Sequence, residues 1–128
     1  MVAQQSFYRA QSVAVQMANV LRHLNSNDFS SINHLTNLFS WLTDEHSIDL
    51  KKIGNPSYWH QLSTRHFPPD AQGIAVLLKT TDSQMPSESL IMTNARHIQT
   101  HYFSILAMAE ILGSTAIVEM GFCKRIIQ

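Results

Sequence analysis

The chain has 128 residues, of which 45% are hydrophobic, nine are basic and nine are acidic, so its formal net charge is zero. This length and apolar content suit one hydrophobic core and are short for two, so we expect a single domain over residues 1–128. The absence of a basic stripe disfavours nucleic acid as the main partner, and no apolar run approaches the roughly 20 residues that cross a bilayer.

Surface charge and cysteine usage narrow the partners and the compartment. Only 14% of the residues are charged, which leaves little electrostatic barrier to association, so we expect a protein partner or a homo-oligomer. The single cysteine, Cys123, has no partner for an internal disulfide, and the N-terminal residues form no apolar signal segment. Both observations predict a reducing cytoplasm. We expect no cofactor, because the four glycines are dispersed and form no phosphate-binding loop.

The first part of the chain predicts two antiparallel helices. Apolar residues at alternating spacings of three and four predict a long helix over residues 4–25, with the inward residues Phe7, Ala10, Ala14, Met17, Leu21 and Leu24. The polar cluster at residues 25–28 predicts the end of this helix and the cap of a second. The inward residues of the second helix are then Ile32, Leu35, Leu38, Phe39 and Leu42. The connection between them is short, which favours an αα-hairpin.

The helical period is lost from residue 47 to residue 69, where prolines and Gly54 mark turns around a short helix over residues 58–64. A further helix is expected to begin at Pro69, although Gly73 disfavours it. After Pro86, apolar spacing predicts a long helix that ends at Gly113. Residues 116–128 fit a short helix or a terminal strand, and we favour the helix. The sequence therefore predicts an all-α fold, a compact bundle of four to five helices with an irregular connection around residues 47–69.

Two histidines suggest a metal site. His97 and His101 are four residues apart, so on a helix they would point the same way and could hold one metal ion. The glutamate of a zincin motif is absent, which excludes that protease class. A third ligand would have to come from His60, His66 or Glu110, none of which is fixed by spacing. The alternative is a pair of structural histidines that bind neighbouring backbone.

An aromatic segment suggests a contact surface for a protein partner. Tyr58, Trp59, Arg65 and Phe67 are the residue types that dominate binding energy at interfaces. The alternative is that Trp59 and Phe67 close one end of the bundle. On the predicted helices, Trp41 and Phe103 fall away from the apolar stripes, so either a neighbouring helix of the chain or a second copy must cover them. We favour the second copy, which makes both residues candidate contacts between two copies.

These observations favour a small protein that is not an enzyme and that binds a protein partner through a fixed helical-bundle surface, as an adaptor, inhibitor or immunity-type protein. Such a protein would have no catalytic residues. A metal-dependent enzyme or metal sensor that uses His97 and His101 is the first alternative. A helical subunit of a nucleic-acid-processing complex is the second.

Overall fold

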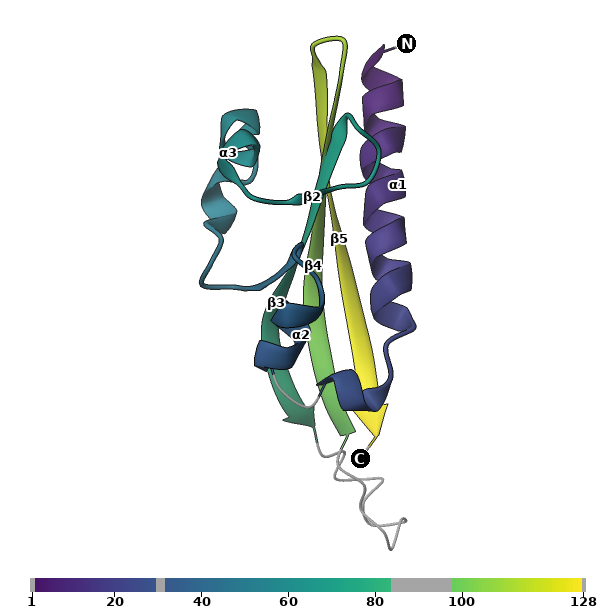
Figure 1. Cartoon of the computed structure of the whole chain (residues 1–128), viewed down its shortest axis with the longest axis vertical. Helices are drawn as coiled ribbons and strands as arrows, with labels where there is room; N and C mark the ends of the chain where they lie inside the picture. The colour runs from purple at the N-terminus through teal and green to yellow at the C-terminus, as the bar shows by residue number, and fades with distance from the viewer. Residues whose placement is uncertain (1, 30–31, 84–97, 128) are drawn as a thin grey trace, which may run out of the picture.

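The computed structural model has mixed α/β architecture, in which one long helix packs on a five-stranded mixed sheet (Figure 1). The structure describes residues 2–29, 32–83 and 98–127. The prediction of an all-α bundle of four to five helices is therefore wrong. No helix in the described residues is long and apolar enough to cross a membrane.

The elements follow one another with short connections in the first half of the chain and form long strands in the second. The helices are α1 (Val2–Arg22), α2 (Ile32–Leu38) and α3 (Pro56–Gln61), with the 3-10 helices η1 (Ser26–Phe29) and η2 (Leu50–Lys52). The strands are β1 (Leu42–Asp44), β2 (Arg65–His66), β3 (Ala71–Ser83), β4 (Ile98–Ile111) and β5 (Ser114–Ile127).

The sheet has the order β1-β3-β4-β5, with β2 also paired to β3. β1 runs parallel to β3, whereas β2 and β4 run antiparallel to β3, and β5 runs antiparallel to β4. Figure 1 shows three layers, with α1 on one side of the sheet and α3 on the other. The strands β3, β4 and β5 therefore lie between two covering layers over part of their length.

The long helix forms as its sequence predicts. Most of its predicted inward residues are buried, Ala10 and Met17 among them, and with Val13 they pack against β3 and β4. Phe7 was also predicted to point inward, but it is 44% exposed. Gly73 of β3 allows this close approach, because a Cβ atom at this position would lie 2.6 Å from side-chain atoms of both Val13 and Met17. The helix begins at Val2 and ends at Arg22, three residues earlier than the predicted end.

The second cluster of buried residues lies on the other side of the sheet. Trp59 of α3 is fully buried there against Val76 and Leu106, and its indole nitrogen donates to the carbonyl oxygen of Ile53 at 2.8 Å. Asn55 caps α3 by accepting from the amide of Ser57 at 3.0 Å. The short helix predicted over residues 58–64 is therefore present, although it begins at Pro56.

The helices predicted in the second half of the chain are wrong. The segment after Pro69 forms β3, residues 98–111 form β4, and the tail forms β5. Residues 84–97, where the long helix was predicted to begin, lie outside the described residues. Because β4 is buried on both faces, it shows no alternation of apolar and polar residues, and apolar spacing alone does not separate a buried strand from a buried helix.

The predicted function depended on the bundle surface and is wrong in that form, because no helical bundle is present in the described residues. The metal-dependent alternative is corrected for the same reason. It assumed that both histidines lie on one helix, whereas residues 98–111 form β4 and His97 lies outside the described residues. Within the described residues, no group of three metal-ligating side chains is close enough to hold a metal.

Candidate functional site

The two edges of the sheet differ. The outer edge of β3 is paired with β2 at Gln72 and Gly73 and with β1 from Ala75 to Leu77, where the amide of Ala75 also donates to the carbonyl oxygen of Trp41 at 2.8 Å. In contrast, β5 pairs with β4 alone among the described strands. A free edge presents a row of backbone donors and acceptors to which another strand can be added.

The hairpin turn defines which backbone groups of β5 are free. Leu112 and Gly113 both have positive φ angles, of 49° and 81°, and Ile111 lies opposite Ser114, as in a two-residue type I′ turn. The pair that flanks such a turn exchanges backbone hydrogen bonds, and such pairs alternate along the ladder. The even-numbered residues of β5 therefore bond to β4, and the odd-numbered residues from Thr115 onward direct their amides and carbonyls outward.

The side chains of β5 alternate between the two faces of the sheet. Val118, Met120 and Phe122 are partly buried and pack against the core beneath α1. The odd-numbered side chains point to the opposite face, where Glu119 and Arg125 are both exposed. The strand contains no proline, and its pairing with β4 runs from Ser114 to Ile127 without a register shift. It therefore lacks the prolines and bulges that commonly protect sheet edges.

Lys124 anchors the lower part of β5 to the end of α1. Its ammonium group donates to the carbonyl oxygens of Leu21 at 3.0 Å, Arg22 at 2.8 Å and Leu24. The carbonyls of Leu21 and Arg22 belong to the last turn of α1, so the lysine caps the helix C-terminus. Desolvation by burial lowers the pKa of Lys124, and the negative charge of Asp28 partly opposes this effect. The side chain is therefore directed inward and leaves the edge open.

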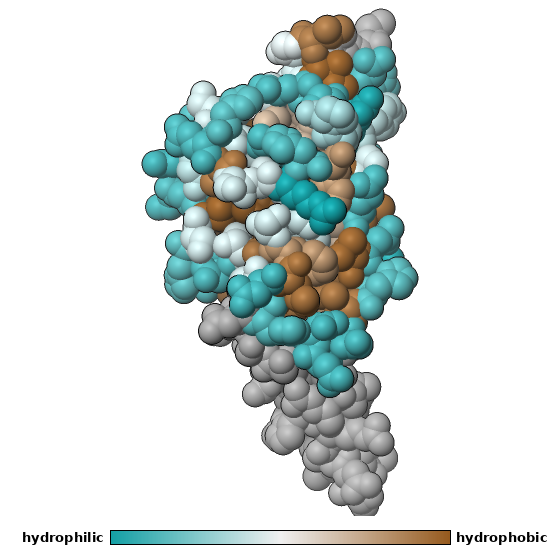
Figure 2. All heavy atoms as spheres, in the orientation of Figure 1, coloured by the Kyte–Doolittle hydropathy of each residue, from teal (hydrophilic) through white to brown (hydrophobic). Residues whose placement is uncertain are grey.

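The upper end of β5 lies beside exposed apolar side chains. Leu112 is 89% exposed at the hairpin tip, and Phe7 and Tyr8 of α1 are also exposed. Figure 2 shows hydrophobic surface at this end of the molecule, where Figure 1 places the hairpin and the start of α1. The hydroxyl of Ser6 donates to the carbonyl oxygen of Ser114 at 2.9 Å, which fixes the hairpin against the helix.

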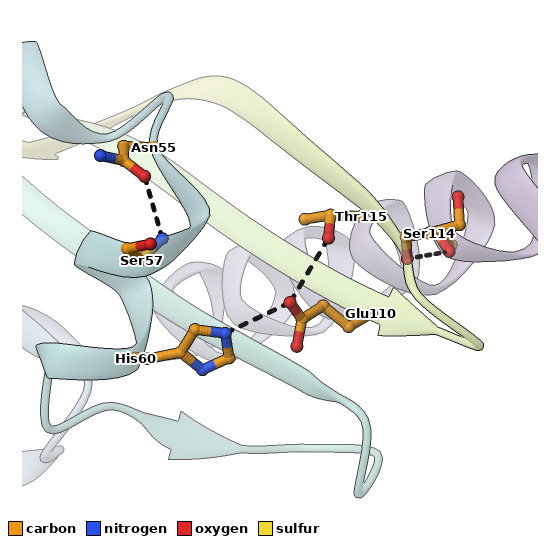
Figure 3. A network of polar contacts seen from close by, with 7 residues as sticks. Asn55, Ser57, His60, Glu110, Ser114 and Thr115 are labelled. Atoms are coloured by element: carbon orange, nitrogen blue, oxygen red, sulfur yellow. Dashed lines mark hydrogen bonds and ion pairs between the residues drawn. The ribbon is translucent and has the colours of Figure 1, made fainter.

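A second candidate is a polar network between α3 and the β4–β5 hairpin (Figure 3). The ring of His60 lies 3.2 Å from the carboxylate of Glu110, which also accepts from the hydroxyl of Thr115 at 3.4 Å. The adjacent hollow has a volume of about 210 Å³, which is below the usual size of ligand pockets. The histidine and the carboxylate both retain considerable exposure to solvent. The network therefore joins α3 to the hairpin, and its one hydroxyl near the carboxylate, that of Thr115, donates to it.

A larger hollow of about 490 Å³ lies beside the N-terminal half of α1. It is lined by Gln5, Tyr8, Arg9, Ser12, Asp70 and Ile111. Its two charged groups bind each other, because the guanidinium of Arg9 lies 3.2 Å from the carboxylate of Asp70. The hollow therefore offers no free charge to a ligand.

The structure places most of the predicted contact residues inside the protein. Trp41 and Trp59 have no exposed surface and Phe103 is 2% exposed, so all three belong to the core. Tyr58 is partly buried, and its hydroxyl accepts from the amide of Asp49 at 3.0 Å. The predicted roles of these residues in binding a partner or a second copy stay predictions.

Arg65 is the first residue of β2, and Phe67 follows the strand directly. The guanidinium of Arg65 is exposed and lies 5.2 Å above the ring of Phe67, which is itself partly buried beside Trp41. The guanidinium of Arg65 therefore contacts the ring of Phe67 and stays accessible to solvent.

Only one of the two histidines of the predicted metal site lies within the described residues. His97 lies outside the described residues. His101 lies on β4, is 2% exposed, and its ring packs against Phe29 with centroids 4.8 Å apart. The proposed third ligands His60, His66 and Glu110 lie around the small polar hollow at the other end of β4. The structure therefore separates the candidate ligands into two places.

The edge of β5 was missed by the sequence interpretation, although a signal was present. Apolar and non-apolar residues alternate from Val118 to Phe122, and Leu112-Gly113 precedes them as a turn. This alternation is typical of a strand with one covered face. No protein family model, curated protein or solved structure matches this chain.

Proposed function

We propose that this protein binds an extended segment of a protein partner by adding that segment as a strand to the edge of β5. The observation that carries the proposal is the contrast between the two edges, because β1 and β2 pair with one edge and no described strand pairs with the other. In strand addition, backbone hydrogen bonds supply affinity and alternate side chains supply specificity.

The length of the free edge supports the proposal. β5 has 14 residues, whereas a typical strand has about 5–6. Long, uninterrupted edges favour aggregation, and soluble proteins usually shorten or interrupt them. The retention of this edge without proline or bulge is therefore best explained by a strand that pairs with it.

The balance of charge is consistent with a protein partner. The nine basic and nine acidic residues give no net charge, so neither phosphate backbones nor anionic lipid surfaces would be attracted over long distances. The proposal assigns no catalytic step to the protein. A cytoplasmic location, suggested by the single cysteine, belongs to the same proposal.

Gly121 offers a matched pair of substitutions that tests this proposal. Its amide points outward, and no atom lies within 4 Å of the position of an added Cβ. Gly121→Ala keeps the outward amide, whereas Gly121→Pro removes it without removing a bond to β4. Peptides selected from a random display library on the immobilised chain serve as the probe.

We expect selected peptides to bind the alanine variant about as well as the original chain and the proline variant at least about tenfold more weakly, since several edge bonds are lost together. Circular dichroism checks that both variants fold. Hydrogen exchange of the unchanged chain gives a second measurement, in which bound peptide should slow exchange at Glu119, Gly121 and Cys123. Equal peptide binding by both variants, with no added protection at these amides, would contradict the proposal.

A further inference from the structure

The geometry points to a second copy of this chain as the partner strand. We propose that two β5 strands pair antiparallel about a two-fold axis that passes through Phe122, so that one sheet continues through both copies. This inference rests on the proposed function of the edge and names its occupant. Three features of β5 favour the same register: its outward backbone groups, the charges of Glu119 and Arg125, and the side chain of Phe122.

The backbone restricts the register first. Only odd-numbered residues of β5 direct their amides and carbonyls outward, so an odd-numbered residue must lie opposite an odd-numbered residue of the second copy. Pairing of residues on the same face imposes the same condition, because side chains alternate along a strand. A symmetric antiparallel pair that meets this condition is centred on a residue of β5. The register is then defined by which residue of β5 lies on the two-fold axis.

The charges on the open face select one centre. Within the described side chains of β5, Glu119 and Arg125 are the charged residues on the face opposite α1. A centre at Phe122 places Glu119 opposite Arg125 of the second copy, twice in each pair. A centre at Glu119 or at Arg125 would place two like charges opposite each other, which disfavours pairing.

Both charged groups are able to form the new ion pair. No carboxylate among the described side chains lies within ion-pair distance of Arg125. The carboxylate of Glu119 accepts from the hydroxyl of Ser104 at 3.0 Å, which holds it on the open face and leaves its other oxygen for a partner.

The side chains at the centre of this register are also complementary. Phe122 faces itself in a non-hydrogen-bonded pair, where opposite Cβ atoms are closest and aromatic pairs stabilise sheets. Its ring is partly buried and lies 6.0 Å from the ring of Phe103, so its position is already fixed. On the other face, Gly121 lies opposite Cys123 of the second copy, where the glycine leaves space for the thiol. No large side chain therefore obstructs the pairing.

Charge reversal tests the register through a mixing experiment. Glu119→Arg or Arg125→Glu alone places like charges opposite each other at both symmetric positions. A mixed pair of the two variants restores opposite charges at both positions. We expect each variant alone to dimerise at least about tenfold more weakly than the original chain, and the mixture to recover to within about threefold. Sedimentation velocity on variants with tags of different mass measures all three species.

A cross-linking experiment tests the same register without changing a charge. With oxidised glutathione as the oxidant, Gly121→Cys should give a covalent dimer, because the new thiol lies opposite Cys123 of the second copy and two thiols lose two electrons to form each disulfide. The same substitution in a Cys123→Ser background should give none. A centre at Gly121 would reverse the second result, and a centre at Cys123 would cross-link the original chain.

The outcomes separate this inference from the proposed function. A chain that stays monomeric at about 100 μM, or a dimer that neither charge reversal nor mixing affects, overturns the inference. If such a chain still binds library peptides with added protection at Glu119, Gly121 and Cys123, the edge has a different partner and the proposed function stands. Loss of both kinds of binding in a folded chain overturns both. Recovery by mixing together with the expected cross-link supports the inference.

Discussion

Replacing Lys124 with methionine tests the cap that joins the last strand to the first helix. The substitution keeps the length of the side chain but removes three donated hydrogen bonds to the end of α1 and the contact of the ammonium with the ring of Phe29 at 5.2 Å. A hydrogen bond to a charged group contributes about 1.5–3 kcal/mol, and a cation at a helix C-terminus contributes about 0.3–1 kcal/mol. Because the lysine is only partly buried, the lower values apply.

We therefore expect Lys124→Met to lower the free energy of unfolding by about 2–3 kcal/mol. For 128 residues, an unfolding entropy of roughly 2.1 cal/mol/K per residue converts this loss into a decrease in Tm of about 7–11 °C. Urea titration and calorimetry at one protein concentration measure both quantities. Lys51→Met is the matched control, since Lys51 is exposed and its side chain should contribute less than about 0.5 kcal/mol. Equal stability of the two variants would refute the capping role.

Three further predictions concern the packing, the turn and the pH dependence. Gly73→Ala should destabilise the fold by about 1–3 kcal/mol, because its Cβ would lie 2.6 Å from Met17, whereas Gly121→Ala, in open space, should not; thermal unfolding compares them. Leu112→Asn should stabilise the fold by roughly 0.5–1 kcal/mol relative to Leu112→Ala, because asparagine tolerates the φ of 49°; equal Tm values would contradict this reason. The folded pKa of Lys124 lies below its ordinary value of 10.5 because burial disfavours the charge. Between the folded and unfolded pKa values, the unfolded chain therefore binds more protons than the folded chain. The contribution of Lys124 to the free energy of unfolding should rise as the pH increases through this window. The Lys124→Met variant should lack this dependence of the free energy of unfolding on pH.

The helices α1 and α3 could be predicted from the sequence, whereas the helices predicted for the C-terminal half were wrong. The predicted αα-hairpin is also wrong, because α2 ends at Leu38 and packs on β1 and η1. In α1, Ala10 and Met17 face the sheet while the opposite side is polar, so the helical period is visible. In β4, neighbours such as Ile105 and Leu106 are both buried because α1 covers one face and α3 the other. Double burial removes the alternation that marks a strand, and the remaining apolar positions fit a helix by coincidence.

The candidate site was missed for a related reason. Large aromatic residues indicate either a core or an interface, and here Trp59 proved to be core. Binding through an edge depends on backbone groups, which every residue carries, so residue identity does not reveal it. Only the pairing partners in the folded sheet distinguish the outward amides of β5 from those of β3. The pair Glu119 and Arg125 becomes meaningful once the strand and its faces are known.

The bond between Lys124 and the carbonyl of Leu21 joins positions 103 residues apart. A ribosome synthesises α1 before any strand, so the apolar side of the helix stays uncovered until β3 and β4 have emerged and is covered fully only after β5. The contact of α1 with β5 therefore forms only after the other strands have been synthesised, and until the strands are available the nascent helix offers an apolar surface to chaperones. Ribosome-bound chains arrested before residue 114 should be cleaved readily within α1, whereas released full-length chains should resist the same protease.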